Sequence, residues 1–116
     1  MSQLQPLPDA VLQFRDERDW AQFHTLPDLL ISLSLETAEA LETVQWRSRE
    51  GHALSLKPEQ KEHLAEELAD ILAYLLAAAH KADIDLEAAF FEKMQKNALK
   101  YPVDKALGRS DKYHDL

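Results

Sequence analysis

Apolar residues recur every three to four positions along most of this 116-residue chain, rather than at every second position. That spacing is typical of amphipathic helices. It predicts four helices. The first covers about residues 9–23, and the second runs from a cap at Thr25 or Asp28 to about Arg49. The third runs from Pro58 to about Lys81, and the fourth from just after Asp85 to Lys100 or Tyr101. Pro27, Gly51, Asp83 and Pro102 lie at the expected breaks, because proline starts or stops helices and glycine or aspartate suits their ends.

Helices joined by short connections favour an all-α fold, and the expected architecture is an antiparallel four-helix bundle. The length predicts a single domain over residues 1–116, with an irregular tail over residues 103–116. Helices of this length would leave apolar surface uncovered in a monomer, including part of the Leu72–Leu76 face. We therefore expect a homo-oligomer.

Composition narrows the function. Thirteen basic and 21 acidic residues give a net charge of −8, which argues against general affinity for nucleic acid or for an anionic membrane. The lack of cysteine excludes disulfides and thiolate metal sites. The start of the chain has neither the basic nor the apolar region of a secretory signal, and the apolar run 71–79 is too short to cross a bilayer. A cytoplasmic protein is expected.

The charge is divided unevenly along the chain. Residues 93–116 hold six basic and three acidic residues, a balance of +3, so residues 1–92 carry −8 − 3 = −11. A site for a metal-chelated polyphosphate would use such a division. Taken alone, however, the pattern favours lysines on a solvated helix and tail.

Carboxylate pairs at three-residue spacing are the candidate chemistry. They are Asp16/Asp19, Glu36/Glu39, Glu39/Glu42, Glu59/Glu62 and Glu67/Asp70. Of these pairs, only Glu36/Glu39 and Glu67/Asp70 lie at the edge of an apolar stripe. At about 100° per residue, Glu39 lies about −60° from Glu36, and Asp70 lies about −60° from Glu67. In each helix, apolar residues lie within about 100° of the first glutamate, on the side away from its acidic partner. They are Leu29, Leu33, Ala40 and Val44 around Glu36, and Leu64, Leu68, Ile71 and Leu75 around Glu67.

If the two helices pack antiparallel along these stripes, Glu36, Glu39, Glu67 and Asp70 converge. Four unpaired carboxylates at a half-buried seam call for a divalent cation or for protonation. Mg²⁺ suits ligands that are all oxygen and bridges carboxylates to substrate phosphates. Neither pair has the histidine of a di-iron E-x-x-H motif. A pair of helices bound by salt bridges to arginine or lysine remains the alternative.

At these residues the sequence resembles the MazG-like all-α nucleotide pyrophosphohydrolases, in particular the short branch of dCTP pyrophosphatases. The resemblance is carried by FRDERDW at 14–20, LETAEALETVQW at 35–46, EELADILAYL at 66–75 and KMQKNALKYPV at 93–103. The final SDKYHDL is also similar to that branch. These segments cover most of the chain in the order of the family.

The resemblance implies Mg²⁺ as cofactor and cleavage between the α and β phosphates. It implies that Glu36, Glu39, Glu67 and Asp70 bind the metal and form the catalytic set. It also implies that seven residues bind the substrate: Trp20, Trp46 and Tyr74 at the base, and Lys93, Asn97, Lys100 and Tyr101 at the nucleotide and its phosphates. Helical geometry agrees, placing Tyr74 on the face of Glu67 and Trp46 about 10 Å beyond Glu39. Core packing is the alternative role for the three base-pocket aromatics.

The sequence departs from the family where relatives often read F-H-x-P-[RK]-N-L. This chain has Phe23, His24, Thr25, Leu26, Pro27 and Asp28 before Leu29, and Val44 stands where a phenylalanine is frequent. These departures leave the metal ligands intact but leave the base preference open. His24 is a weak candidate for the pocket, and His52, His63, His80 and His114 have no assigned role.

The expected function is Mg²⁺-dependent hydrolysis of a nucleoside triphosphate to monophosphate and pyrophosphate, on (deoxy)cytidine or modified pyrimidine triphosphates, in nucleotide-pool sanitation. Either Glu36 or Glu39 could act as the base for the attacking water. A dUTP or phosphoribosyl-type substrate is the nearer alternative. A non-enzymatic helical module that binds a basic partner is the more distant one. The resemblance implies a dimer or a tetramer, with active sites near the subunit interfaces.

Overall fold

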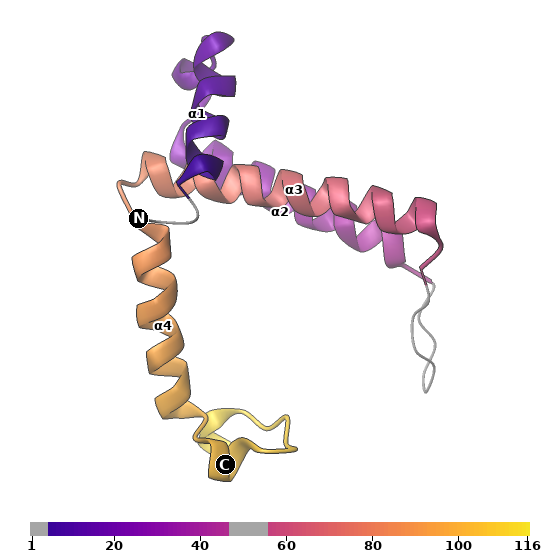
Figure 1. Ribbon diagram of the computed structural model, residues 1–116, viewed down its shortest axis with the longest axis vertical. Coiled ribbons are helices and arrows are strands. Elements are labelled where there is room, and N and C mark those ends of the chain that lie inside the picture. The colour runs from indigo at the N-terminus through magenta and orange to yellow at the C-terminus, as the bar shows by residue number, and fades with distance from the viewer. Residues whose placement is uncertain (1–4, 47–55) are drawn as a thin grey trace. The chain divides into compact units, whose positions relative to one another are not determined.

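The computed structural model describes residues 5–46 and 56–116, and every regular element within these ranges is helical (Figure 1). The all-α fold class predicted from the sequence is confirmed. The elements are α1 (Pro6–Glu17), the 3₁₀ turn η1 (Ala21–Phe23), α2 (Leu26–Val44), α3 (Pro58–Lys81), α4 (Leu86–Lys100), α5 (Val103–Ala106) and the 3₁₀ turn η2 (Tyr113–Asp115).

The chain forms two compact units, residues 1–84 with α1, α2 and α3, and residues 85–116 with α4 and α5. In the first unit α2 and α3 lie side by side and antiparallel, and α1 packs against α3 (Figure 1). The antiparallel pairing predicted for the two acidic helices is thus confirmed. The four-helix bundle and the single domain stay predictions, because α4 belongs to the second unit.

A small apolar core joins the three helices of the first unit. Leu29 near the start of α2 packs with Ala77 and Ala78 near the end of α3, and all three are buried. Val11 of α1 and Tyr74 of α3 pack against this cluster. The alanines let the helices approach closely, so the core fixes the register in which α2 passes α3.

Side chains cap the helix starts much as the sequence predicts. The hydroxyl of Thr25 accepts a hydrogen bond from the Asp28 amide (3.3 Å), and the Asp85 carboxylate accepts one from the Ala88 amide (3.1 Å). At the start of α3 the Gln60 side chain accepts from the Lys57 amide (2.9 Å). Such caps satisfy donors that the first helical turn leaves free.

Two helices end in Schellman motifs with an aspartate in the left-handed conformation. Asp19 (φ 54°) follows α1, and the Trp20 amide donates to the Arg15 carbonyl (3.0 Å). Asp83 (φ 55°) follows α3, and the Ile84 amide donates to the Ala79 carbonyl (2.9 Å). Aspartate tolerates this conformation better than most residues. The break predicted at Asp83 is confirmed.

The predicted bounds of the first helix were wrong. It begins at Pro6 rather than near residue 9, because proline is tolerated in a first helical turn. It ends at Glu17 rather than at Phe23, because the turn at Asp19 closes it and the chain continues into η1.

The second helix also ends earlier than predicted, at Val44. Gln45 is extended (ψ 137°) and Trp46 is left-handed (φ 68°), so Trp46 does not continue the helix. The predicted end near Arg49 and the cap at Gly51 lie outside the described residues. The tail after Pro102 is less irregular than predicted, since it contains α5 and η2.

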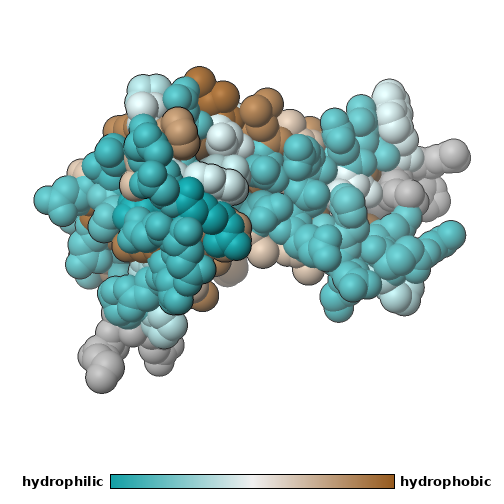
Figure 2. Space-filling view, turned by 90° about the horizontal axis from the view of Figure 1, so that it is seen from above, coloured by the Kyte–Doolittle hydropathy of each residue, from teal (hydrophilic) through white to brown (hydrophobic). Residues whose placement is uncertain are grey.

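Several apolar residues of the first unit are exposed. On α2 they include Ile31 (57%) and Leu35 (59%), and on α3 Leu68 (53%), Leu72 (38%) and Leu75 (37%). Leu68 of the predicted stripe is thus exposed in a single chain, while the exposure of Leu72 and Leu75 confirms that part of the Leu72–Leu76 face is left uncovered. Figure 2 shows apolar side chains among a largely hydrophilic surface. None of the helices in ranges 5–46 and 56–116 is long and apolar enough to cross a membrane.

Candidate active site

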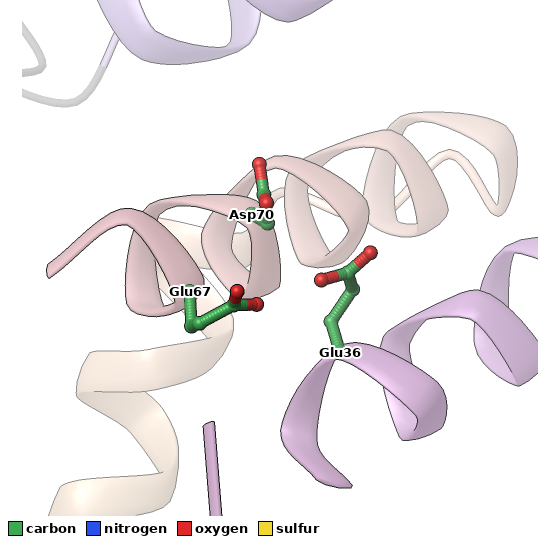
Figure 3. Close-up of side chains that lie close together, drawn as sticks. All are labelled: Glu36, Glu67 and Asp70. Carbon is green, nitrogen blue, oxygen red and sulfur yellow. The ribbon is translucent and has the colours of Figure 1, made fainter. Parts of the chain in front are cut away.

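Three of the four predicted metal ligands meet where α2 passes α3. One carboxylate oxygen from each of Glu36, Glu67 and Asp70 lies within 4.8 Å of the others. Figure 3 shows Glu36 reaching across from α2 while Glu67 and Asp70 extend from neighbouring turns of α3. The antiparallel pairing of the two helices thus produces the convergence that the sequence predicts for these three residues.

The environment of this cluster disfavours its negative charge. Oε2 of Glu36 and Oε2 of Glu67 are buried without a hydrogen-bond partner among the described residues. Burial is the main cause that raises the pKa of Glu36 to about 7, and a hydrogen-bonding contact with Glu39 adds to it. The charges of Glu39, Asp70 and Glu67 raise that pKa further.

Glu39, the fourth predicted ligand, is exposed at the edge of the cluster and contacts two of its members. Burial is again the main cause that raises the pKa of Glu67, followed by hydrogen bonding to Glu39 and by its charge. Two carboxyls form such a hydrogen bond only when one of them is protonated. A proton or a cation at this cluster would relieve the repulsion among the four side chains.

These residues fit a hard divalent cation. Carboxylate oxygens are the ligands that Mg²⁺ takes in proteins, and the two buried oxygens lack any other partner in the described chain. No lysine or arginine forms a described ion pair with any of the four, which disfavours the salt-bridged alternative.

A pocket of about 410 Å³ adjoins the cluster between the same two helices. It is lined by Glu39, Glu42 and Thr43 of α2 and by His63 and Glu67 of α3. Nε2 of His63 lies 3.6 Å from Oε1 of Glu67, one helical turn away. No role was expected for His63 from the sequence, and its position four residues before a predicted metal ligand was the available signal.

The three aromatic residues predicted at the base do not meet in one chain. Tyr74 packs on the core cluster near the start of α2, whereas Trp46 follows the end of α2 and is 88% exposed. Leu29 and Val44 are separated by about 22 Å of helix. The prediction that Trp46 continues the helical face of Glu39 was wrong, because α2 ends before it.

Trp20 lies between α1 and α2. Its ring contacts Phe14 edge to face (centroids 5.8 Å apart) and lies 6.5 Å from the His24 ring. Nδ1 of His24 is buried without a partner in the described ranges. A base-binding role for Trp20, Trp46 and Tyr74 stays a prediction.

The predicted phosphate-binding residues belong to the second unit. Lys93, Asn97 and Lys100 follow one another at four- and three-residue spacing, so they share one face of α4, and Tyr101 comes directly after it. Nζ of Lys100 lies 4.9 Å from the ring centroid of Tyr113 in η2, and the Tyr101 and Tyr113 rings pack edge to face at 6.3 Å. The end of the chain thus folds back onto the end of α4.

Fold and site together define an all-α protein with a carboxylate-rich candidate metal centre between antiparallel helices. The chain belongs to the MazG-like family, whose model matches residues 31–116. This confirms the family suggested by the sequence motifs.

Known relatives agree with this assignment. The chain is 41% identical over 105 residues to dCTP pyrophosphatase 1 of Rattus norvegicus and 39% identical to that of Homo sapiens. Each match covers 90% of this chain and 62% of the relative, so the chain spans less than two thirds of these curated proteins. A crystal structure of a pyrophosphatase from Archaeoglobus fulgidus is 37% identical, with a TM-score of 0.79, covering 88% of this chain and 94% of that one.

Proposed function

We propose that the protein is a Mg²⁺-dependent nucleoside triphosphate pyrophosphohydrolase that releases a nucleoside monophosphate and pyrophosphate. The observation that carries this proposal is the meeting of Glu36, Glu67 and Asp70 between α2 and α3, with two buried oxygens unpartnered among the described residues. The relatives named as pyrophosphatases support the reaction class.

In this proposal Glu36, Glu67 and Asp70 hold Mg²⁺, with Glu39 completing the set. The bound cation would neutralise charge that develops on the pyrophosphate leaving group. Glu39 is the member outside the three-oxygen cluster, and its carboxylate is exposed. It is therefore the better placed of the two candidate bases to accept the proton of the attacking water.

Lys93, Asn97, Lys100 and Tyr101 would bind the nucleotide and its phosphates from the second unit. A lysine supplies a positive charge with three hydrogen-bond donors, which suits a terminal phosphate. Nζ of Lys100 lies over the Tyr113 ring, a contact that favours this position of the ammonium group.

The substrate proposed is a (deoxy)cytidine or modified pyrimidine triphosphate, because the relatives carry the name dCTP pyrophosphatase. The departures from the family around residues 24–28 leave dUTP or a phosphoribosyl-type substrate as the alternative. For a (deoxy)cytidine or modified pyrimidine triphosphate, the proposed role is nucleotide-pool sanitation.

We further propose that a second copy of the chain completes the active site. Trp46 and Tyr74 lie toward opposite ends of the α2/α3 pair, so one chain does not gather them around one base. The exposed residues Ile31, Leu35 and Leu72 provide apolar surface that a second copy would bury. A dimer or a tetramer built from dimers is expected by light scattering, and a monomer would contradict this part of the proposal.

The direct test is pyrophosphate release from dCTP, 5-modified dCTP, dUTP and dATP, measured with Mg²⁺ and with EDTA. We expect turnover that EDTA abolishes and that Glu36→Gln lowers by at least about a hundredfold. Glu62→Gln, an exposed carboxylate on α3, is the matched control and should retain activity. Turnover that persists in EDTA would contradict the metal assignment, and release of inorganic phosphate alone would contradict the cleavage position.

A further inference from the structure

We propose that His63 is a nitrogen ligand which, together with Glu67, lets the pocket beside the acidic cluster bind a transition-metal cation such as Mn²⁺. The inference deepens the proposed function, on which it rests for the role of Glu67, by adding a donor of different chemistry to the same site.

The first observation is the geometry of the pair. His63 and Glu67 are four residues apart on α3 and therefore lie on one face, with Nε2 and Oε1 3.6 Å apart. This separation is too long for a hydrogen bond. Two ligands each about 2.1 Å from one ion stand about 3.0 Å apart at a right angle and about 3.4 Å apart at a tetrahedral angle. A small rotation of the imidazole brings Nε2 to such a distance.

The second observation is that the two side chains differ in solvent exposure and in hydrogen bonding. The His63 side chain is 59% exposed and can adjust, while the Glu67 side chain is only 14% exposed. Oε2 of Glu67 is buried with no partner in the described ranges. A histidine and a glutamate one turn apart on a solvated helix contribute little as an ion pair. Here the carboxylate is mostly buried and its Oε2 has no partner, so a cation bound to this carboxylate has a clear energetic role.

The third observation is the space around the pair. The pocket of about 410 Å³ has room for a hydrated ion, and its wall on the α2 side supplies Glu39, Glu42 and Thr43. All its lining atoms come from the unit that holds α2 and α3. No third histidine, aspartate or glutamate of the described ranges has a ligand atom within 4.8 Å of both side chains, so waters held by Glu39, Glu42 and Thr43 would complete the coordination of a cation between His63 and Glu67.

The donor set determines which cation binds more tightly when His63 is present. Mg²⁺ prefers oxygen ligands and retains its waters, so an imidazole nitrogen adds little to its binding. First-row transition metals bind an imidazole nitrogen more strongly than Mg²⁺ does, and Mn²⁺, which also accepts carboxylate oxygens, is the weakest binder of that series. His63 should therefore strengthen the binding of Mn²⁺ and leave the binding of Mg²⁺ nearly unchanged.

The experiment measures metal binding without nucleotide, using Mn²⁺ alone and Mg²⁺ alone on the full chain. We expect His63→Ala to weaken Mn²⁺ binding by about tenfold or more and to change Mg²⁺ binding by less than about twofold. Pulsed electron paramagnetic resonance of the Mn²⁺-loaded protein should show ¹⁴N coupling from an imidazole, and this coupling should disappear in His63→Ala.

His80→Ala is the matched control, because His80 is an exposed histidine on the same helix. His63→Gln keeps a polar side chain without the imidazole and should behave as His63→Ala does. Absence of ¹⁴N coupling in the unchanged protein would overturn the proposal, as would equal Mn²⁺ affinity in His63→Ala. Because no hydrolysis is measured, failure of this proposal and failure of the proposed activity are seen separately.

Discussion

The carboxylates of Glu36 on α2 and Glu67 on α3 face each other, and each has one buried oxygen without a hydrogen-bond partner in the described chain (Figure 3). Two like charges held this close repel each other, and burial weakens the solvation that would offset the repulsion. The metal-free protein is therefore destabilised by this repulsion, which a cation, a proton or a substitution can remove.

The first prediction concerns substitution of Glu36. At pH 8, above the raised pKa of Glu36, Glu36→Gln removes one charge from the cluster with little change in shape, so it should raise the Tm of the metal-free protein by about 4 °C. Mg²⁺ should raise the Tm of the unchanged protein and have much less effect on the variant. Differential scanning calorimetry in EDTA and in Mg²⁺ measures both effects.

Glu62→Gln is the control for that measurement, because it removes a charge elsewhere on α3. It should leave the response to Mg²⁺ intact. A Glu36→Gln protein that is less stable than the unchanged chain in EDTA would show that the carboxylate contributes stabilising contacts instead.

The second prediction is the pH dependence of stability without metal. The pKa of Glu36 is raised from 4.5 to about 7 in the folded protein, so the folded state binds a proton there more tightly than the unfolded state does. The resulting stability is fully present below pH 4.5 and is lost as the pH rises through about 7. Glu67 shifts in the same direction.

Urea denaturation in EDTA at pH 5 and pH 8 tests this prediction. The free energy of unfolding of the unchanged protein, relative to Glu36→Gln, should be lower at pH 8 than at pH 5. Comparing the two proteins removes the contributions of the other titrating groups. An equal difference at both pH values would mean that Glu36 has the same pKa in the folded and unfolded states.

The third prediction concerns the core that sets the register of α2 and α3. Leu29 is 3% exposed and packs with Ala77 and Ala78, so Leu29→Ala should reduce the free energy of unfolding by about 2 to 5 kcal/mol. Leu99→Ala removes the same atoms from a side chain that is 82% exposed and should change it by less than about 0.5 kcal/mol. Denaturant titration followed by circular dichroism compares the two, and similar losses would contradict this location of the core.

The fourth prediction concerns the tail. Tyr113 faces the ammonium group of Lys100, so Tyr113→Ala should raise KM for the nucleotide by about two- to fivefold with little change in kcat. Tyr113→Phe keeps the ring and should behave as the unchanged protein. Initial rates over a range of substrate concentrations give both constants. An equal effect of the two substitutions would assign the role to the hydroxyl rather than to the ring.

The local sequence predicted much of the fold, because its signals act within a few residues. The third helix begins at Pro58 and ends at Lys81 as predicted, and Thr25 caps the second. Errors arose where competing local signals ended a helix early. The left-handed turn at Asp19 closed α1, and the extended backbone at Gln45 ended α2 before Trp46.

By itself the sequence determined the helical class and the two acidic pairs beside apolar stripes, because helical periodicity places residues three and four apart on one face. Only the tertiary structure decided which carboxylates meet. The packing of Leu29 on Ala77 and Ala78 sets where α2 passes α3, and that register brings Glu36 to Glu67 and Asp70 and leaves Glu39 at the edge. A pocket lies beside His63 between the same two helices, and Tyr74 packs on the core near the start of α2 whereas Trp46 follows its end. These contacts depend on side-chain packing between helices distant in sequence, which periodicity within one helix does not determine.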